Sequence, residues 1–333
     1  MVIRSEYVVG IDGIAVVVHP SNPLSQLRTA DVARIFSGEI NNWSQVGGPD
    51  KAITVYARDN QSGTWDTFRK LVLGKTYKLT STAERFESNT TLSGRVADDS
   101  AAIGFVSLNT IGRAKALAIA AGETRALNPE RLTVATEDYA LARRLYLYLP
   151  GVEPNAYARD FMSWVIGVQG QEIVDRVGYI SQNIKPLLAD ISATPNSYKN
   201  LVQDSQRLSV NFRFHDGKAQ LDNKAQQDVK RIVEFMKSNP GNLLLVGFAE
   251  GNGGSYSQLL SKLRAKVVRR ALIRAGVSRR HLDLYGYGKY LHLSDGNDQS
   301  AKVKNRRVEV WFEASPQQLS QTGKRENLEE REA

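Results

Sequence analysis

The sequence predicts an α/β protein with two domains, and three observations support this. Short apolar runs of strand length alternate with segments of helical periodicity through residues 1–185. A stretch rich in Ala, Ser, Thr, Pro and Asn over 186–205 interrupts this pattern and predicts a linker, with a short helix expected near 198–202. Over 206–315 a second set of segments follows in the order β-α-β-α-β-β, which predicts a two-layer sandwich. The 333 residues suffice for two ordinary domains.

In the first domain, strands alternating with helices indicate a largely parallel sheet. The strands are expected at 8–18, 53–56, 103–106, 117–120, 132–134 and 144–149. The helices are expected at 29–36, 65–73, 157–167 and 171–177. Thr29 is the expected N-cap of the first helix, because its hydroxyl can accept a hydrogen bond from an early backbone amide.

In the second domain, the strands are expected at 210–214, 243–246, 282–288 and 308–312. One helix is expected at 223–238, and another follows a glycine- and serine-rich loop and stops at Gly276. The apolar face of that second helix is expected to consist of Leu259, Leu260, Leu263, Val267, Ala271 and Leu272, with a basic face opposite. Residues 316–333 are polar and charged and are expected to be a disordered tail.

Composition and motifs exclude several classes of site. The chain has no cysteine, which excludes disulfides and thiolate metal ligands. Its four histidines form neither an HExxH motif nor a close pair, so neither a metal site nor a cofactor is expected. The chain lacks a GxSxG elbow, a phosphate loop and a GxGxxG fingerprint. We therefore expect neither an enzyme with catalytic residues nor a nucleotide-binding protein.

The net charge of +9 lies entirely in the second half. Residues 1–205 carry 21 basic and 21 acidic side chains, whereas 206–333 carry 23 and 14. Such a basic half could favour nucleic acid, an anionic surface or an acidic polymer. We do not expect nucleic acid, because the basic residues fall largely on one amphipathic helix.

The sequence shows no membrane span and no targeting segment. Its apolar runs are far too short to cross a bilayer, and no basic and apolar leader with a small-residue cleavage site begins the chain. We therefore expect that the chain either stays in the cytoplasm or has lost its leader.

A strand–loop–helix junction in the first domain has the residues of an oxyanion site. Ser62, Gly63 and Thr64 stand where a helix N-terminus presents free backbone amides, and the glycine permits close approach. Arg58, six residues before Thr64, can add a forked positive charge. The alternative is that Ser62 or Thr64 only caps the helix.

A second candidate pair lies in the second domain. Glu250 follows the strand at 243–246, and Arg264 lies two turns into the next helix. An acid and a base held in this way could bind a small zwitterionic ligand. The alternative is a βα unit with a solvated charged face.

Over about 206–313 the second domain resembles the OmpA-type C-terminal domain, a peptidoglycan-binding module of Gram-negative envelope proteins. The resemblance rests on the pattern LSxxRA…GYG…NRRVEV, which begins at Leu260. In that family a strand-end acid pairs with the ammonium of diaminopimelate in the stem peptide, and the helix arginine pairs with its carboxylate. The resemblance assigns these roles to Glu250 and Arg264 and places Arg307 near the same pocket. Here a glutamate replaces the usual aspartate, and the loop is one residue shorter.

Over about 8–180 the first domain resembles the phosphate-binding protein of ABC transporters, in the periplasmic binding protein superfamily. The resemblance rests on GIDGIAVVVHPSNP, IFSGEINNW and ARDNQSGTWDTF. It implies type II lobes, with Arg58, Ser62, Gly63 and Thr64 as phosphate ligands. The family opens with a further segment of the first lobe that supplies the opposite wall of the site. Its absence here leaves the first lobe incomplete, so we expect uncovered apolar helix faces and a natural start upstream of Met1.

These resemblances imply a non-enzymatic binding protein of the periplasm, associated with the cell wall or outer membrane. Its first domain would capture phosphate or a related oxyanion, and its second would anchor it to peptidoglycan. An ABC transporter permease is a further expected partner. The alternative is a structural or adaptor protein whose first domain no longer binds phosphate.

Overall fold

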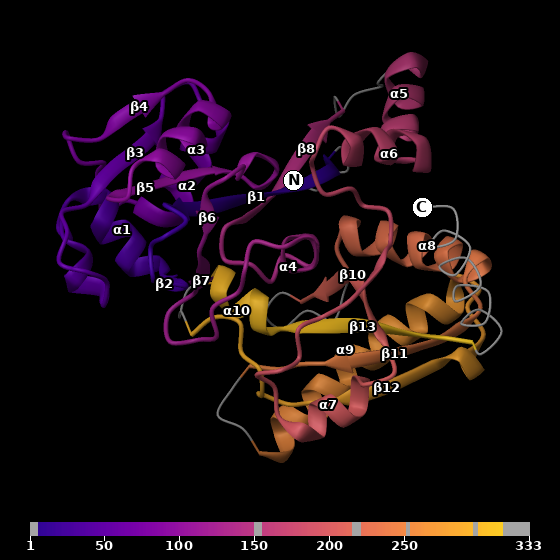
Figure 1. Cartoon of the computed structure of the whole chain (residues 1–333). Coiled ribbons are helices and arrows are strands. Elements are labelled where there is room, and N and C mark those ends of the chain that lie inside the picture. The colour runs from indigo at the N-terminus through magenta and orange to yellow at the C-terminus, as the bar shows by residue number, and fades with distance from the viewer. Residues whose placement is uncertain (1–5, 150–154, 215–220, 251–253, 296–298, 316–333) are drawn as a thin grey trace, which may run out of the picture. The chain divides into compact units, whose positions relative to one another are not determined.

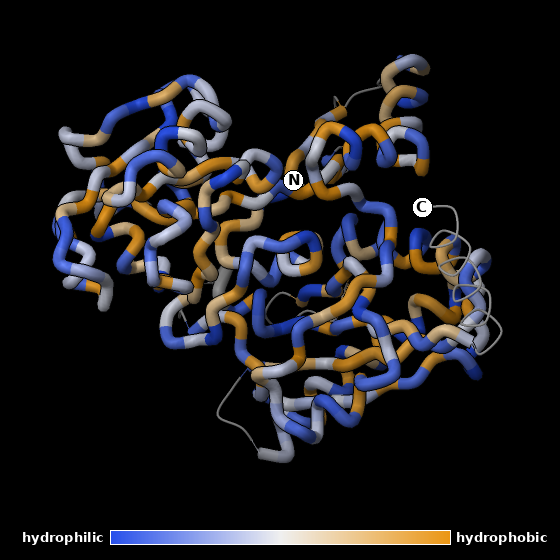
Figure 2. Tube along the Cα trace, viewed as in Figure 1, coloured by the Kyte–Doolittle hydropathy of each residue, from blue (hydrophilic) through white to orange (hydrophobic). Residues whose placement is uncertain are grey.

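The computed structural model of the chain folds as two compact units, each with its own hydrophobic core (Figure 1). The residues that it describes are 6–149, 155–214, 221–250, 254–295 and 299–315. The two units are Met1–Gln182 with Leu293–Asn297, and Asn183–His292 with Asp298–Ala333. In Figure 2 the hydrophobic residues gather along the strands and inner helix faces, whereas the connecting loops are mostly hydrophilic.

The first unit is built around one long strand, β1 (Glu6–Val18). Its sheet has the order β4-β3-β5-β1-β6, and β8 also pairs with β1. The other strands of this sheet are β3 (Thr54–Arg58), β4 (Glu84–Phe86), β5 (Ala102–Ser107), β6 (Lys115–Ala116) and β8 (Ala142–Tyr148). The prediction of a largely parallel sheet is wrong, because β1 runs antiparallel to β5, β6 and β8, and the parallel pairs of this sheet are β3 with β4 and β3 with β5. A separate parallel pair joins β2 (Gln26–Arg28) and β7 (Ala118–Ala120).

The apolar run of β1 is continuous because both of its faces are buried. Side chains alternate across a strand, so Ile14, Val16 and Val18 enter one core cluster and Ala15 and Val17 enter another. The two glycines of this run lie where helical elements approach closely. A Cβ at Gly10 would be 2.9 Å from a methyl of Val174, and one at Gly13 would be 2.8 Å from a methyl of Val134.

The helical segments of the first unit agree with the sequence in part. They are α1 (Thr29–Ser37), η1 (Trp43–Val46), α2 (Gly63–Phe68), η2 (Arg69–Leu73), α3 (Asn89–Asp98), η3 (Leu108–Thr110), α4 (Arg131–Ala135), α5 (Ala156–Ile166) and α6 (Val168–Arg176). Two expectations are wrong. The strand expected at 132–134 is part of α4, which the side chain of Thr133 helps to cap. Arg28 is the N-cap residue of α1, and the Thr29 hydroxyl instead donates to the Ala120 carbonyl at 3.0 Å.

Two helices of the first unit carry exposed apolar side chains. Helices α5 and α6 lie one after the other beside β1, and they bury few of their large side chains. The exposed ones on or next to these helices are Tyr157, Phe161, Trp164, Val168, Ile173 and Val177.

The second unit has a five-stranded sheet in the order β12-β11-β13-β10-β9. Its strands are β9 (Pro186–Leu187), β10 (Gln206–Arg213), β11 (Gly241–Gly247), β12 (Leu282–Gly286) and β13 (Arg307–Ala314). Only β11 and β12 are parallel. Helices α8 (Asn223–Ser238) and α9 (Ser255–Arg274) pack on one face, which gives the predicted β-α-β-α-β-β sandwich. A short helix, α10 (Gln299–Asn305), precedes β13.

Part of the predicted linker is folded onto the second unit. Within 186–205, β9 pairs with β10, and α7 (Asn196–Val202) packs against the sheet face opposite α8 and α9. Tyr198 and Val202 of α7 are buried against Phe248 and Trp311. The predicted tail at 316–333 lies outside the described residues.

The buried face of helix α9 agrees only in part with the predicted one: Leu272 lies in the core and Val267 and Ala271 pack against it, but Leu259 and Leu263 do not. Its buried residues are Ser257, Ser261, Arg264, Ala265, Val268 and Leu272. The helix lies so close to the sheet that a Cβ at Gly247 would be 2.1 Å from the Ser261 carbonyl oxygen. Only small side chains fit this contact, and therefore Leu259 and Leu263 point outward, with 55% and 45% of their surface exposed.

Candidate functional site

The predicted oxyanion residues lie at the junction of β3 and α2. Ser62 is the N-cap of α2, and its hydroxyl oxygen accepts hydrogen bonds from the amides of Thr64 (3.2 Å) and Trp65 (3.3 Å). Phe68 fixes the direction of the helix, because its ring stacks on that of Phe105 at 3.9 Å. Ser62 therefore caps the helix, as the alternative interpretation of the sequence predicted. An anion at this turn would share these amides with Ser62 or take its place.

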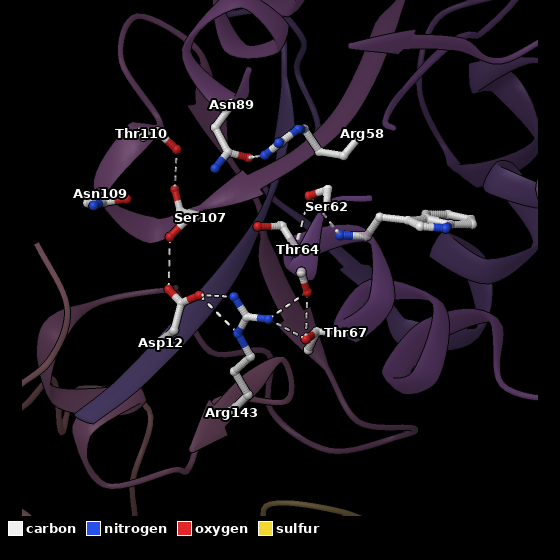
Figure 3. A network of polar contacts seen from close by, with 12 residues as sticks. Asp12, Arg58, Ser62, Thr64, Thr67, Asn89, Ser107, Asn109, Thr110 and Arg143 are labelled. Atoms are coloured by element: carbon white, nitrogen blue, oxygen red, sulfur yellow. Dashed lines mark hydrogen bonds and ion pairs between the residues drawn. The ribbon is translucent and has the colours of Figure 1, made fainter. Parts of the chain in front are cut away.

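Arg58 extends from the end of β3 to the turn that precedes α3 (Figure 3). Its guanidinium donates to the carbonyl oxygens of Phe86 (3.1 Å) and Glu87 and to the side-chain oxygen of Asn89. Burial lowers its pKa, an effect that the neighbouring carboxylate of Asp59 opposes. A guanidinium has five N–H groups, and these hydrogen bonds use three of them. The other two, one on each terminal nitrogen, could donate to a ligand.

A second arginine, which the sequence analysis did not select, contacts the same turn. Arg143 at the start of β8 donates to the Gly63 carbonyl oxygen at 2.6 Å and to the Thr67 hydroxyl. On its other side it donates to one carboxylate oxygen of Asp12, at 3.0 and 2.7 Å (Figure 3). Asp12 is 2% exposed, and its other oxygen accepts a hydrogen bond from Ser107 at 2.9 Å. The network thus fixes the turn to β1 and β8.

One sequence signal could have revealed this network. Asp12 is the only charged residue in the apolar run from Val8 to Val18, and a buried carboxylate requires a partner. The partner, Arg143, is 131 positions away, so local patterns do not identify it. Arg143 contacts the N-terminal turn of α2, whereas the guanidinium of Arg58 is bound at the turn before α3. The α2 turn itself offers backbone amides and hydroxyls, which are the donors that an oxyanion requires.

The second candidate site lies where β11 ends. Arg264 of α9 donates to the carbonyl oxygen of Phe248 at 3.0 Å, and its guanidinium lies 5.9 Å from the ring of Phe214. The guanidinium of Arg307 lies over the ring of Phe248, 3.9 Å from its centre. Glu250 follows two residues after Phe248. The structure thus brings the three predicted residues to one end of the sheet, around Phe248.

The acid of this site is paired with a residue that the sequence analysis did not select. A carboxylate oxygen of Glu250 lies 2.7 Å from the Nε atom of Arg306, and 27% of the Glu250 side chain is exposed. Its neighbour Arg307 is only 2% exposed. The pattern Asn-Arg-Arg offers two adjacent arginines at the start of β13, but it does not indicate which of them pairs with Glu250.

Arg307 belongs to a buried charge cluster. It donates to Glu309 at 2.9 Å and to the carbonyl oxygen of Leu291 at 3.0 Å. Glu309 also pairs with Arg207 at 2.8 Å and accepts a hydrogen bond from the Tyr198 hydroxyl. Burial opposes ionisation of Glu309, but the two arginines outweigh it and lower its pKa to about 2. The cluster thus keeps Arg307 in a fixed position.

His292 lies near the same end of the sheet. Burial lowers its pKa below 6.5, and the positive charge of Arg307 lowers it further, whereas Glu250 acts in the opposite direction. At neutral pH its imidazole is therefore uncharged.

The described residues contain no group of three His, Cys, Asp or Glu side chains that could hold a metal ion. Among the helices within these residues, none has both the length and the hydrophobicity that crossing a bilayer requires.

Two family models match the chain: residues 4–168 match the PBP superfamily domain, and residues 213–306 match the OmpA family. The phosphate-binding protein PstS of Bacillus subtilis (strain 168) is 29% identical over 176 residues, 53% of this chain and 57% of that protein. Outer membrane porin F of Pseudomonas fluorescens is 30% identical over 113 residues, 33% of this chain and 35% of that protein. An ABC-type phosphate transport receptor from Vibrio cholerae has 26% identity and a TM-score of 0.48, with 53% and 71% of the two chains covered.

The chain spans about half the length of the PstS relatives that it matches. It combines a PBP-like domain, similar to phosphate-binding proteins, with a C-terminal OmpA-family domain. Both predicted resemblances are thereby confirmed.

Proposed function

We propose that this chain is a non-enzymatic binding protein of the bacterial envelope. Its first unit would capture phosphate or a related oxyanion, and its second unit would attach the protein to peptidoglycan. The observation that carries the proposal is the presence, on one chain, of an arginine-flanked Ser-Gly-Thr turn and of an acid and an arginine around the end of β11. The periplasm and an ABC transporter permease as partner belong to the same proposal.

At the second site, the diaminopimelate of a stem peptide would offer an ammonium to Glu250 and a carboxylate to Arg264. Glu250 is accessible, and its present partner Arg306 satisfies only part of its accepting capacity, since a carboxylate has about four lone-pair sites. Arg264 donates to the main-chain carbonyl oxygen of Phe248, and its guanidinium could also donate to a ligand carboxylate.

Sedimentation with purified sacculi tests this anchoring. We expect the intact chain to sediment with sacculi and Glu250→Gln to reduce the retained fraction by about tenfold, the effect of losing one charged hydrogen bond. Lys230→Gln, an exposed change on α8, serves as the control. No retention of the wild-type chain, or equal retention of all three proteins, would refute anchoring through this site.

At the first site, the anion would lie at the N-terminus of α2, with the Thr64 hydroxyl, the Gly63 amide and Arg58 as donors. Calorimetric titration with inorganic phosphate tests this arrangement. We expect Thr64→Val to weaken binding by about tenfold, because it removes one hydroxyl donor to a charged ligand. The control is Thr82→Val, whose hydroxyl contacts only Thr80.

The second candidate function is an adaptor whose first unit binds no phosphate. Two observations favour it: the Ser62 hydroxyl and three donors of Arg58 already bind the chain itself, and α5 and α6 expose apolar side chains. Retention by sacculi without any heat of phosphate binding would select the adaptor over the capture protein.

A further inference from the structure

The outward face of α9 contributes neither to the core of the second unit nor to the candidate sites. Residues three and four apart lie on one side of a helix. This spacing defines an outward stripe on α9 that runs along the helix from end to end. Its members are Tyr256, Leu259, Leu263, Lys266, Arg270 and Ile273, and Lys262, Arg269 and Arg274 flank it.

The apolar members of the stripe are well exposed. Tyr256 is 73% exposed, and Ile273 at the other end of the helix is 37% exposed. Leu259 and Leu263 lie between them and are also about half exposed. Single exposed leucines are ordinary, but an aligned set on one helix points to a partner.

The cations of the stripe have no acidic partner among the described residues. Between Glu250 and Asp283 the sequence has eight lysines and arginines and no acidic residue. The neighbouring helix α8 does not neutralise them. Its Asp228 pairs with Lys224 and Arg231, and its Glu234 pairs with Lys237. The stripe and its flanks thus form a surface of one sign, interleaved with aliphatic side chains.

We propose that this stripe docks the second unit on an anionic membrane surface. The lysines and arginines would contact lipid phosphates, and Leu259, Leu263 and Ile273 would enter the boundary between headgroups and acyl chains. Nucleic acid would need the same cations, but it would leave the aliphatic side chains in water. Arg264 lies on the buried side of α9, so membrane docking does not require the peptidoglycan site.

Vesicle sedimentation with the full chain tests the proposal. The vesicles are phosphatidylcholine alone, or phosphatidylcholine with about 30% phosphatidylglycerol, the anionic lipid that supplies the charge for this attraction. We expect binding only to the anionic vesicles. Each cation near such a surface strengthens binding about fivefold, so Lys266→Gln with Arg270→Gln should lower the partition coefficient by roughly 25-fold. Leu259→Ser with Leu263→Ser should lower it about tenfold, through lost apolar burial.

Lys230→Gln with Lys237→Gln, on α8, removes the same charge elsewhere on the second unit and should change binding less than twofold. If this control and the α9 charge variant lower the partition coefficient equally, the attraction depends on net charge and not on the stripe, and the proposal is wrong. Unchanged vesicle binding by the variant Leu259→Ser with Leu263→Ser would show that these side chains do not enter the membrane. Absence of vesicle binding, together with retention of double-stranded DNA or self-association of the chain, would assign the stripe to that partner instead.

Discussion

Replacing Glu309 with glutamine tests how much a buried charge cluster stabilises the second unit. The carboxylate lies between Arg207 and Arg307, at 2.8 and 2.9 Å, and it also accepts a hydrogen bond from the indole of Trp311 at 3.2 Å. Glutamine keeps the shape of the side chain but removes its charge. Two buried arginines would then lose the carboxylate that they share.

The pKa of Glu309 gives the expected magnitude. A fall from 4.5 in the unfolded chain to about 2 in the folded one corresponds to roughly 3 kcal/mol of stability at neutral pH. Because the folded pKa is the lower one, this stability is fully present above pH 5 and is lost as the pH falls toward 2. Loss of one partner from a buried pair costs about 3 to 5 kcal/mol, in agreement with this value.

Hydrogen exchange of the full chain, followed by mass spectrometry, measures the loss of stability strand by strand. At pH 7 we expect Glu309→Gln to lower the opening free energy of β10 and β13 amides by about 3 kcal/mol, with β5 of the first unit unchanged as the internal reference. Urea unfolding at pH 7 and pH 3 should show a smaller difference between the two proteins at the lower pH. A loss below about 1 kcal/mol at pH 7 would refute the argument, because hydrogen bonds alone would explain it.

Three further predictions concern the packing and the sites. Gly247→Ala should cost about 2 kcal/mol in the unfolding free energy measured by calorimetry, because its Cβ would overlap the Ser261 carbonyl, and an unchanged transition would contradict the close helix–sheet contact. Tyr139→Phe should cost about 1 kcal/mol in urea unfolding, since its buried hydroxyl donates to the Ile14 carbonyl at 2.9 Å. The NMR titration of His292 should give a midpoint below 6.5, so its contribution to stability is lost as the pH falls below 6.5, and a midpoint above 6.5 would be incompatible with its burial.

The sequence predicts the strands better than it predicts the faces of the helices. Leu243, Leu245 and Val246 are buried in β11, and a short apolar run of this kind is enough to predict a strand from the local sequence. The buried face of α9 depends instead on Gly247 and Gly286, which lie on two different strands and are both approached closely by Ser261. The prediction therefore placed Leu259 and Leu263 on the buried face wrongly, because the close contact leaves no room for leucine.

The elements that the sequence analysis missed have weak local signals. Helix α3 contains two threonines and Gly94, which lower its helix propensity, and it forms because Leu92 and Val96 pack on the sheet. Strand β9 has two residues and exists only through its pairing with β10. Tertiary contacts decide both cases, and such contacts are not visible in a single local window.

The candidate sites share one means of positioning arginines, which local sequence cannot reveal. Main-chain carbonyl oxygens orient the guanidinium groups at both sites: Arg58 binds Phe86 and Glu87, Arg143 binds Gly63, Arg264 binds Phe248, and Arg307 binds Leu291. A carbonyl oxygen orients a guanidinium without neutralising it, although Arg143 and Arg307 also pair with the carboxylates of Asp12 and Glu309. Lysine cannot replace arginine in this arrangement. Its ammonium group lacks the planar set of donors with which a guanidinium binds a carbonyl oxygen on one side and a ligand on the other. Arginine, rather than positive charge in general, is therefore what each site requires.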